Sequence, residues 1–447
     1  MKNQDYKLSR YNITVDLNKD EKLLFNCMSS GLIKLDKKFS NLFETVSSKL
    51  GKKSLNEKEK TFLEKLIEGR YIVDKNLNEI DLLRLRCQES KFQKDHYGLT
   101  ICPTLDCNLR CIYCYENRKT KHMGKKEIEK IKKLVANKIE KIKSLNITWY
   151  GGEPLLYPKI IDELTDYFIK ECEKFNVLYN AKIVTNGTLI DKLDESFFTR
   201  NKINNAQITI DGPQIIHDQR KPFANGMGSF NKILNNLRTL LKKSLSVSVR
   251  VNIDETNLKK IEPLFPILEP LKRKYSEKFV IYFAAVDTTG FGACRSLEEG
   301  MTRKNFSEYK LKLIDSSKNY GFTYEVNPKT KFTNCMIYST TSFVVDPECK
   351  LYKCWYVVGE QKHCVGVIND KGSIDMTNYS YWLDCVMNDP IQRKECLDCE
   401  ILPLCLGGCP MKAAENSKLG PCLEYKFQIK EVLKRYYESK TEQKAVS

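Results

Sequence analysis

Between residues 97 and 321 the chain alternates short strand-like runs with helical stretches, six times in succession. The first helical stretch places apolar residues three or four positions apart from Ile128 to Ile142, which is the pattern of one buried helix face. Repeated β/α units predict a parallel sheet covered by helices, and such folds bind their ligands at the carboxyl ends of the strands. The expected strands cover residues 99–104, 147–150, 181–184, 206–210, 247–253 and 279–286.

Three cysteines, Cys107, Cys111 and Cys114, follow the first expected strand at the spacing C-x3-C-x2-C. Three thiolates hold only three irons of a four-iron cluster, so the fourth iron stays open to bind and activate a small molecule. Because the chain has 18 cysteines, a triplet of this spacing arises by chance with a probability of about 0.03. The triplet alone is therefore suggestive but not sufficient.

A second group of cysteines near the carboxyl end has the spacing C-x2-C-x5-C-x3-C and a further cysteine after twelve residues. Its chance probability is on the order of 0.001 even before the last cysteine is counted. The alternative is a zinc site or a disulfide framework. Cytosolic thiols stay reduced, and a chain of 447 residues can bury a core without disulfides, so metal or redox use is favoured. The members are Cys396, Cys399, Cys405, Cys409 and Cys422.

With the aromatic Tyr113 before its last cysteine, the triplet resembles the motif of the radical S-adenosylmethionine (SAM) superfamily. The resemblance implies an α/β fold, a (β/α)6 partial TIM barrel of the radical SAM type. It also implies that Cys107, Cys111 and Cys114 hold a [4Fe-4S] cluster. Once reduced by a donor such as flavodoxin or ferredoxin, that cluster would cleave SAM to a 5'-deoxyadenosyl radical, with Tyr113 beside the cofactor.

The segment Gly151-Gly152-Glu153 follows the second expected strand. Adjacent glycines let the backbone approach a ligand closely, and a neighbouring carboxylate can receive an ammonium group. In radical SAM enzymes the matching segment contacts the amino group of SAM. The resemblance therefore assigns Gly151, Gly152 and Glu153 to the cofactor.

Polar residues at the ends of the third to fifth strands are further candidates for contacts to the ribose or carboxylate of SAM. Asn186, Thr209 and Asp211 belong to Asn-Gly and Asp-Gly segments that are also common turn formers, but their place at successive strand ends favours ligand binding. Arg220 could bind the SAM carboxylate through a bidentate guanidinium contact, or could form a surface ion pair. Asn252 is expected to point inward from the fifth strand.

After about residue 330 the β/α rhythm stops, and ten of the eighteen cysteines lie between Cys335 and Cys422. This pattern resembles the SPASM extension, which carries two auxiliary [4Fe-4S] clusters, so three clusters are expected in all. By resemblance, auxiliary cluster I uses Cys335, Cys354 and Cys409, and auxiliary cluster II uses Cys396, Cys399, Cys405 and Cys422.

One position departs from the SPASM pattern, because Cys349 stands where that family usually has glycine and no cysteine lies just upstream of Cys335. The fourth ligand of cluster I is therefore open between Cys349, Cys364, the distant Cys294 and a substrate thiolate. The remaining cysteines, Cys27, Cys87, Cys102, Cys172 and Cys385, are expected to be packing residues.

Residues 1–90 are expected to form a small α+β module. Strands are predicted at 11–17, 22–27 and 31–36, followed by helices at 37–50 and after a capping box at Ser54 and Glu57, and a returning strand at 71–73. This order resembles the winged-helix peptide-recognition element of peptide-modifying enzymes, where a leader peptide adds a strand to the sheet edge. A dimerisation or capping domain is the alternative. Expected domains are 1–90, 91–325 and 326–430, with a Lys-rich tail at 431–447.

The formal charge of +17 could suggest nucleic acid, but iron–sulfur clusters would lower it and the lysines are spread along helices, so nucleic acid is an unexpected partner. An acidic peptide remains compatible with the surplus. No signal peptide opens the chain and no apolar run is long enough to span a bilayer, which predicts a cytoplasmic protein without a membrane partner.

Together these features predict a radical SAM/SPASM peptide maturase that acts on a ribosomally made precursor peptide with a leader. Thioether cross-linking of a Cys-containing peptide is the expected reaction, with the auxiliary clusters accepting the leftover electron or binding the substrate. An anaerobic sulfatase maturase that forms formylglycine, with Asp287 as its base, is the nearest alternative. Other peptide C–C cross-linking and, more distantly, RNA modification are the remaining ones.

Overall fold

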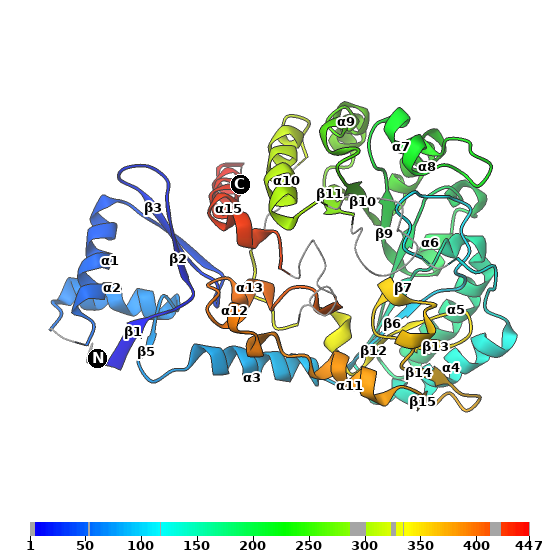
Figure 1. The fold of residues 1–447 in the computed structure, drawn as a ribbon, viewed down its shortest axis with the longest axis horizontal. Coiled ribbons are helices and arrows are strands. Elements are labelled where there is room, and N and C mark those ends of the chain that lie inside the picture. The colour runs from blue at the N-terminus through cyan, green and yellow to red at the C-terminus, as the bar shows by residue number, and fades with distance from the viewer. Residues whose placement is uncertain are drawn as a thin grey trace.

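The computed structural model describes residues 5–51, 54–116, 118–286, 301–322, 328–333, 335–411 and 422–446. A ten-stranded sheet forms the centre of the molecule, and a smaller amino-terminal module lies to one side of it (Figure 1). The carboxy-terminal helices lie between these two parts (Figure 1). None of the described helices combines the length and the apolar character that a bilayer crossing requires.

Six parallel strands form the larger part of the sheet, so the predicted parallel sheet is confirmed. Each of the first four begins three residues earlier than expected, because polar residues such as Asn146 and Asn180 alternate with apolar ones in their first halves. In spatial order the six are β11 (Phe279–Ala285), β10 (Ser246–Ile253), β9 (Ile203–Thr209), β8 (Leu178–Thr185), β7 (Ser144–Trp149) and β6 (His96–Ile101).

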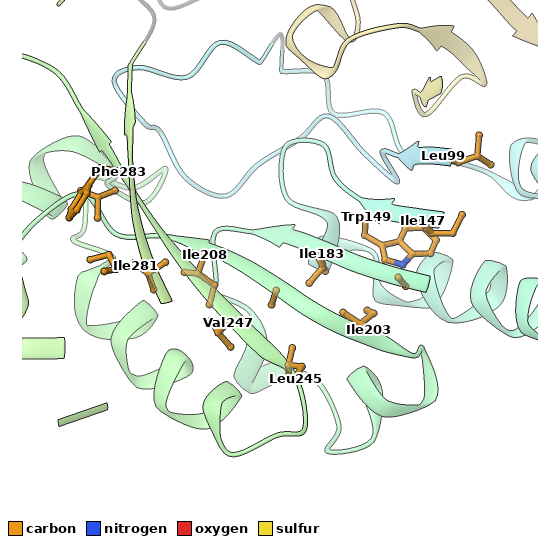
Figure 2. Packing of buried hydrophobic residues seen from close by; sticks show 14 of the residues in the cluster. Leu99, Ile147, Trp149, Ile183, Ile203, Ile208, Leu245, Val247, Ile281 and Phe283 are labelled. Carbon is orange, nitrogen blue, oxygen red and sulfur yellow. The ribbon is translucent and has the colours of Figure 1, made fainter. Parts of the chain in front are cut away.

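Helices cover the outer face of these strands, and the core lies between the two layers (Figure 2). Ile183, Ile208 and Val247 come from three adjacent strands and are at most 1 % exposed. The alternate residues of the same strands point to the inner face and are mostly polar, so the period of two in each strand separates core from cavity. The helices are α4 (Lys125–Ile139), α5 (Pro158–Lys174), α6 (Phe197–Arg200), α7 (Gln214–Arg220), α8 (Phe230–Leu241), α9 (Leu264–Lys274) and α10 (Arg303–Lys318), with short 3-10 turns η2 (Pro154–Leu156), η3 (Ile190–Lys192) and η4 (Leu258–Lys260).

The sheet continues into the cysteine-rich segment, across the domain boundary expected near residue 325. Strand β12 (Ser342–Val345) pairs in parallel with β6, and three antiparallel strands extend the sheet beyond it: β13 (Lys350–Tyr352), β14 (Gly366–Ile368) and β15 (Ile374–Met376). Backbone hydrogen bonds therefore fix the segments that carry Cys335 and Cys354 to the barrel.

Short helices connect and follow these strands. They are η5 (Met336–Tyr338), η6 (Trp355–Val357), η7 (Gln361–His363), α11 (Tyr379–Met387), η8 (Pro390–Gln392), α12 (Lys394–Leu397) and α13 (Leu402–Cys405). The final helix, α15 (Tyr425–Val446), includes the expected Lys-rich tail, and its residues Val432 and Leu433 are buried. The expected tail therefore begins within this helix, where Val432 and Leu433 pack against the rest of the protein.

The amino-terminal module contains the three expected strands as an antiparallel sheet, β2 (Asn12–Asp16), β3 (Lys22–Asn26) and β4 (Gly31–Leu35). Helix α1 (Lys37–Lys49) and helix α2 (Glu57–Glu68) follow, and β5 (Ile72–Asp74) returns to pair with β1 (Tyr6–Leu8). Its winged-helix character stays a prediction.

Two details of this module differ from the expectation. The capping box of α2 is formed by Asn56 and Glu59, each bonding the backbone N–H of the other, and not by Ser54 and Glu57. An unpredicted helix, α3 (Glu79–Lys91), connects the module to the barrel (Figure 1). Its apolar residues do not follow a clear helical period, so the sequence pattern gave no signal for it.

Candidate active site

The three cysteines of the triplet line one cavity of about 330 Å³ at the carboxyl ends of the parallel strands. Their loop follows β6 and is held by backbone hydrogen bonds to the end of α7 and the segment after it, from the N–H of Ile112 to the carbonyl of Arg220 (3.0 Å) and from the N–H of Arg110 to the carbonyl of Pro222 (2.8 Å). The structure therefore brings Cys107, Cys111 and Cys114 together at the barrel mouth.

The surroundings of these thiols suit a cluster with three cysteine ligands. Burial raises the pKa of Cys107 to about 12 and that of Cys114 to about 11, so the free thiols are neutral and bound iron would supply the charge that ionises them. The ammonium of Lys221 lies 3.4 Å from Cys111 Sγ and offers a cation beside an anionic cluster. Three thiols on one wall and an open cavity in front of them match the chemistry of the expected group.

Gly151 and Gly152 line the same cavity because their loop is pressed against the triplet loop. The backbone N–H of Glu153 donates to the carbonyl of Asp106 at 2.8 Å. A Cβ atom on Gly152 would lie 2.2 Å from that carbonyl oxygen, and one on Gly151 would lie 2.2 Å from the carbonyl oxygen of Thr104. Gly151 also has a φ of +112°, which favours glycine. The two glycines are thus required by the close approach of the two loops.

Glu153 does not line the cavity with its carboxylate. The side chain is fully buried and accepts hydrogen bonds from the hydroxyl of Thr185 (2.8 Å) and from the backbone N–H groups of Asn186 (2.7 Å) and Leu155 (3.0 Å). It joins the loop after β7 to the end of β8. Contact with the amino group of SAM stays a prediction, and the cavity wall here consists of the two glycines.

Asn186 and Thr209 line the cavity at the ends of β8 and β9. The amide nitrogen of Asn186 lies 3.6 Å from Cys107 Sγ and donates to the side chain of Asn108 at 2.8 Å. Its amide oxygen accepts from Thr188. The Asn-Gly turn therefore also holds the triplet loop, and contact of Asn186 with SAM stays a prediction.

Tyr113, Asp211 and Asn252 form one hydrogen-bonded group. The Tyr113 hydroxyl donates to the Asp211 carboxylate and accepts from the Asn252 amide at 3.1 Å, and the other Asp211 oxygen accepts from the Asn252 N–H at 3.0 Å. Tyr113 and Asn252 line the cavity, whereas Asp211 is fully buried behind them. Asn252 points inward as expected, and Asp211 is placed to orient the tyrosine.

Arg220 is buried behind Tyr113, with its guanidinium 5.1 Å from the centre of that ring. The two terminal nitrogens of its guanidinium pair with the carboxylate of Asp254, with Nη1 2.9 Å from Oδ1 and Nη2 2.7 Å from Oδ2. The alternative of a surface ion pair is wrong, because the Arg220 side chain is only 3 % exposed. The predicted contact with the SAM carboxylate stays a prediction.

Several cavity residues were missed from the sequence. Arg250 and Gln207 lie two positions before Asn252 and Thr209 on the same inward strand faces, so strand alternation could have found them. Trp355 and Tyr356 come from the cysteine-rich segment, and no local pattern could have placed them at the barrel mouth. Glu116 also lines the cavity, and burial raises its pKa to about 7, with the nearby Tyr150 hydroxyl acting in the opposite direction.

Comparisons with known proteins agree with this geometry. A family model described as the radical SAM superfamily matches residues 101–265, a range that contains the triplet, both glycines and Asn252. The chain contains a radical SAM domain. This assignment implies a [4Fe-4S] cluster and SAM, and it confirms the predicted partial-barrel fold.

Curated relatives extend the match beyond the radical SAM domain. A cysteine-type anaerobic sulfatase-maturating enzyme of Clostridium novyi (strain NT) is 25 % identical over 370 residues, which cover 75 % of this chain and 95 % of the relative. An uncharacterised protein, MJ0907, of Methanocaldococcus jannaschii is 29 % identical over 278 residues, covering 60 % and 88 %.

A solved structure shows the same fold. The structure of native anSMEcpe with bound AdoMet and Cp18Cys peptide superposes with a TM-score of 0.57 at 19 % identity and covers 77 % of this chain and 96 % of that one.

The second cysteine group of this radical SAM enzyme is brought together around α12, α13 and the start of α15. The thiols of Cys396, Cys399 and Cys422 each act on the pKa of Cys405, which burial raises to about 11. The ammonium of Lys426 lies 3.7 Å from Cys422 Sγ. Within the described ranges no three His, Cys, Asp or Glu side chains meet the geometry of a single-ion site. A four-iron cluster instead binds each cysteine through a different iron, which separates the thiols.

Cys335, Cys354 and Cys409 also lie together, in an apolar cluster beneath the inner face of the barrel. Burial and then the thiols of Cys335 and Cys409 raise the pKa of Cys354. A cavity of about 470 Å³ borders Cys335 and Cys354 on one side and the inward residues of β6 to β9 on the other. Two of the three thiols of the predicted auxiliary cluster I therefore border open space, and the cluster itself stays a prediction.

The structure does not bring Cys349 to these thiols, which corrects the prediction of Cys349 as a metal ligand. Its Sγ donates to the carbonyl of Glu127 on α4 at 3.4 Å, and its backbone has a φ of +61°. The turn at this position thus adopts the left-handed conformation that glycine favours, and the side chain points to α4. Cys364 donates to the carbonyl of Gly366 at 3.3 Å. Cys294 and Asp287 lie outside the described residues.

Proposed function

We propose that this radical SAM enzyme modifies a ribosomally made precursor peptide and joins a cysteine sulfur of that peptide to one of its carbons. The observation that carries the proposal is a pair of neighbouring cavities: one borders the cysteine triplet, the other borders Cys335 and Cys354, and Trp355 lines both. A radical-generating site and a separate thiol-rich site thus share one wall.

The electron balance of thioether formation explains why both sites are needed. A 5'-deoxyadenosyl radical takes one hydrogen atom from the peptide carbon, and the thiol loses one proton as its sulfur bonds to that carbon. One electron remains, and an auxiliary cluster can accept it, because iron–sulfur potentials span about −700 to +450 mV. Cys335, Cys354 and Cys409 would hold auxiliary cluster I, and Cys396, Cys399, Cys405 and Cys422 would hold cluster II.

The residues of the barrel mouth would bind and orient SAM. Reduction of the cluster that the triplet would hold supplies the electron that cleaves SAM. The backbone carbonyls of Gly151 and Gly152 can accept from the SAM ammonium, while Asn186 and Asn252 offer amide groups to its ribose or carboxylate. The backbone N–H groups of Asn186 and Asn252 donate to the buried carboxylates of Glu153 and Asp211. These hydrogen bonds limit the reorientation that the two asparagines need on binding.

The amino-terminal module would bind the leader of the peptide at the outer edge of β4, which has no strand partner among the described residues. An added strand there would protect from hydrogen exchange those amides of Gly31–Leu35 that point away from β3. Protection is expected on adding leader peptide, with no change in β5 as the internal control. If the amides of β4 exchange at the same rate with and without leader, the recognition role is wrong.

The proposal is tested first by anaerobic incubation of the reduced enzyme with SAM and a Cys-containing precursor peptide. The expected products are 5'-deoxyadenosine and a peptide that has lost two hydrogens per link and kept its sulfur. Alanine substitution of Cys107, Cys111 and Cys114 should abolish both products. Formation of 5'-deoxyadenosine by that triple variant would refute the assignment of the triplet.

Formylglycine formation is the second candidate, favoured by the sulfatase-maturating enzymes among the curated relatives. It differs in its product, because conversion of a cysteine to formylglycine removes the sulfur from the peptide. Mass spectrometry of one reaction therefore separates the two candidates. A product without its cysteine sulfur would replace the thioether proposal by the sulfatase-type one.

A further inference from the structure

A fourth thiol lies beside the cysteines of the predicted auxiliary cluster I. Cys385 is on α11, is 5 % exposed, and belongs to the same apolar cluster as Cys335, Cys354 and Cys409. Helix α11 packs against η5, the turn that begins directly after Cys335. The hydroxyl of Tyr381, also on α11, lies 3.6 Å from the sulfur of Met411, two residues after Cys409. The helix thus contacts both segments that carry expected ligands.

We propose that Cys385 is the fourth cysteine ligand of auxiliary cluster I, an inference that rests on the proposed presence of that cluster. The thiols of Cys335 and Cys385 each act on the pKa of Cys354, which places all three within electrostatic reach. The other thiols considered for this role point elsewhere, Cys349 to Glu127 and Cys364 to Gly366.

Hydrogen bonds of Lys353 join the segment that carries Cys354 to the segment after Cys335. Lys353 is 1 % exposed, and its ammonium donates to the backbone carbonyls of Ser339 and Ser342 (2.6 Å for Ser342) and lies 4.7 Å from the centre of the Phe343 ring. These contacts fix the backbone beside two of the expected ligands.

Four cysteine ligands have a consequence for the reaction. A cluster with all four irons ligated by protein has no open iron, so cluster I would transfer electrons and would not bind the thiolate of the peptide. The peptide sulfur would then be held by the cavity walls alone.

The test uses the full-length chain with Cys107, Cys111 and Cys114 changed to alanine, so that only auxiliary clusters remain. This protein should bind close to eight irons, and imidazole, added as a small exogenous ligand, should leave the electron paramagnetic resonance spectrum of the dithionite-reduced protein unchanged. Adding Cys385→Ala should either remove about four irons or leave a cluster whose spectrum shifts with imidazole. Cys364→Ala is the matched control, because it removes another buried thiol of the same apolar cluster and should change neither property.

Cys385→Ser tests the same ligand with little change in volume, since an oxygen ligand would shift the spectrum without imidazole. Circular dichroism confirms that each variant is folded. Unchanged iron content and spectra in both Cys385 variants would overturn the role of Cys385 while leaving the auxiliary clusters in place. A triplet variant that binds no iron would overturn both this inference and the auxiliary part of the proposed function.

Discussion

The ring of Tyr150, directly after β7, stacks on the indole of Trp355 with ring centres 5.2 Å apart and planes 25° apart. Trp355 follows Cys354 and lines both the SAM cavity and the second, thiol-bordered cavity. The Tyr150 hydroxyl in turn contacts that of Tyr115, whose ring stacks on Tyr356 at 4.2 Å. Aromatic side chains from the barrel and from the cysteine-rich segment therefore form one wall of the triplet cavity, and Trp355 in that wall also borders the second cavity.

Trp355→Ala should uncouple SAM cleavage from peptide modification. The triplet site keeps its ligands, so 5'-deoxyadenosine should still form, whereas the wall that separates and orients the reactants loses a stacked pair worth about 0.5–1.5 kcal/mol. We expect the ratio of modified peptide to 5'-deoxyadenosine to fall about tenfold, which corresponds to ~1.4 kcal/mol. Trp355→Phe keeps an aromatic ring and is the control. An unchanged ratio in the alanine variant would contradict a role of this wall in coupling.

Gly152→Ala should disrupt the cavity by steric contact alone. The added Cβ would lie 2.2 Å from the carbonyl oxygen of Asp106 and 2.7 Å from that of Leu105, so the triplet loop must move. We expect iron bound by the triplet and 5'-deoxyadenosine to fall together, measured by iron analysis and product assay.

Gly226→Ala separates this steric effect from backbone strain. Gly226 has a φ of +83°, but a Cβ there meets nothing within 4 Å. This control should lower stability by about 1 kcal/mol and leave iron content unchanged. Equal iron loss in both variants would show that the close approach at Gly152 is not the cause.

Asp254→Asn should strongly destabilise the protein, because it leaves the buried guanidinium of Arg220 without its main counter-ion. Breaking a buried pair in this way costs about 3–5 kcal/mol. Burial acts to raise the pKa of Asp254, but Arg220 outweighs it and holds the pKa below its usual range. The pair therefore stabilises the fold above the unfolded-state pKa of Asp254, and the contribution is lost as pH falls through the folded-state value.

Chemical denaturation at neutral pH measures this effect. Arg200→Gln is the control, because Arg200 forms its pairs with Asp162 and Asp194 at the surface and should change the unfolding midpoint much less. Similar midpoints for both variants would refute the importance of the buried pair.

The strands and the triplet could be predicted because their signals are local. Alternation within a strand and the spacing of Cys107, Cys111 and Cys114 are both read over a few residues. The pairing of β12 with β6 joins segments far apart in the chain, and nothing in Ser342–Val345 identifies its partner. Trp355 could therefore not be placed at the barrel mouth from sequence.

The positions of the extra cysteines in the fold could not be predicted, for the same reason. Cys349 stands close to Cys354 in sequence and so was a natural candidate ligand, but the left-handed turn directs its thiol to α4. Cys385 is further away in the chain, and only the packing of α11 on η5 brings it near. Closeness to Cys354 in the sequence therefore does not tell which cysteine lies close to it in the fold.

His217 should make stability depend on pH below neutrality. Its ring is fully buried, and burial, with Lys221 and Arg220 nearby, holds its pKa well below the usual range. The ring accepts from the N–H of Asp211 through Nδ1, so its proton is on Nε2 and is donated to Ser229. Because only the unfolded chain takes up a proton at this residue as pH falls below about 6.5, the native state should lose up to ~1.4 kcal/mol of stability per pH unit there.

His217→Gln keeps an acceptor and a donor but does not titrate, so its stability relative to wild type should rise as pH falls from 7 to 5.5, measured by chemical denaturation. The cluster is common to both proteins, and its own acid sensitivity therefore cancels in the difference. A curve for His217→Gln that runs parallel to wild type would show that the ring is not kept neutral by the fold.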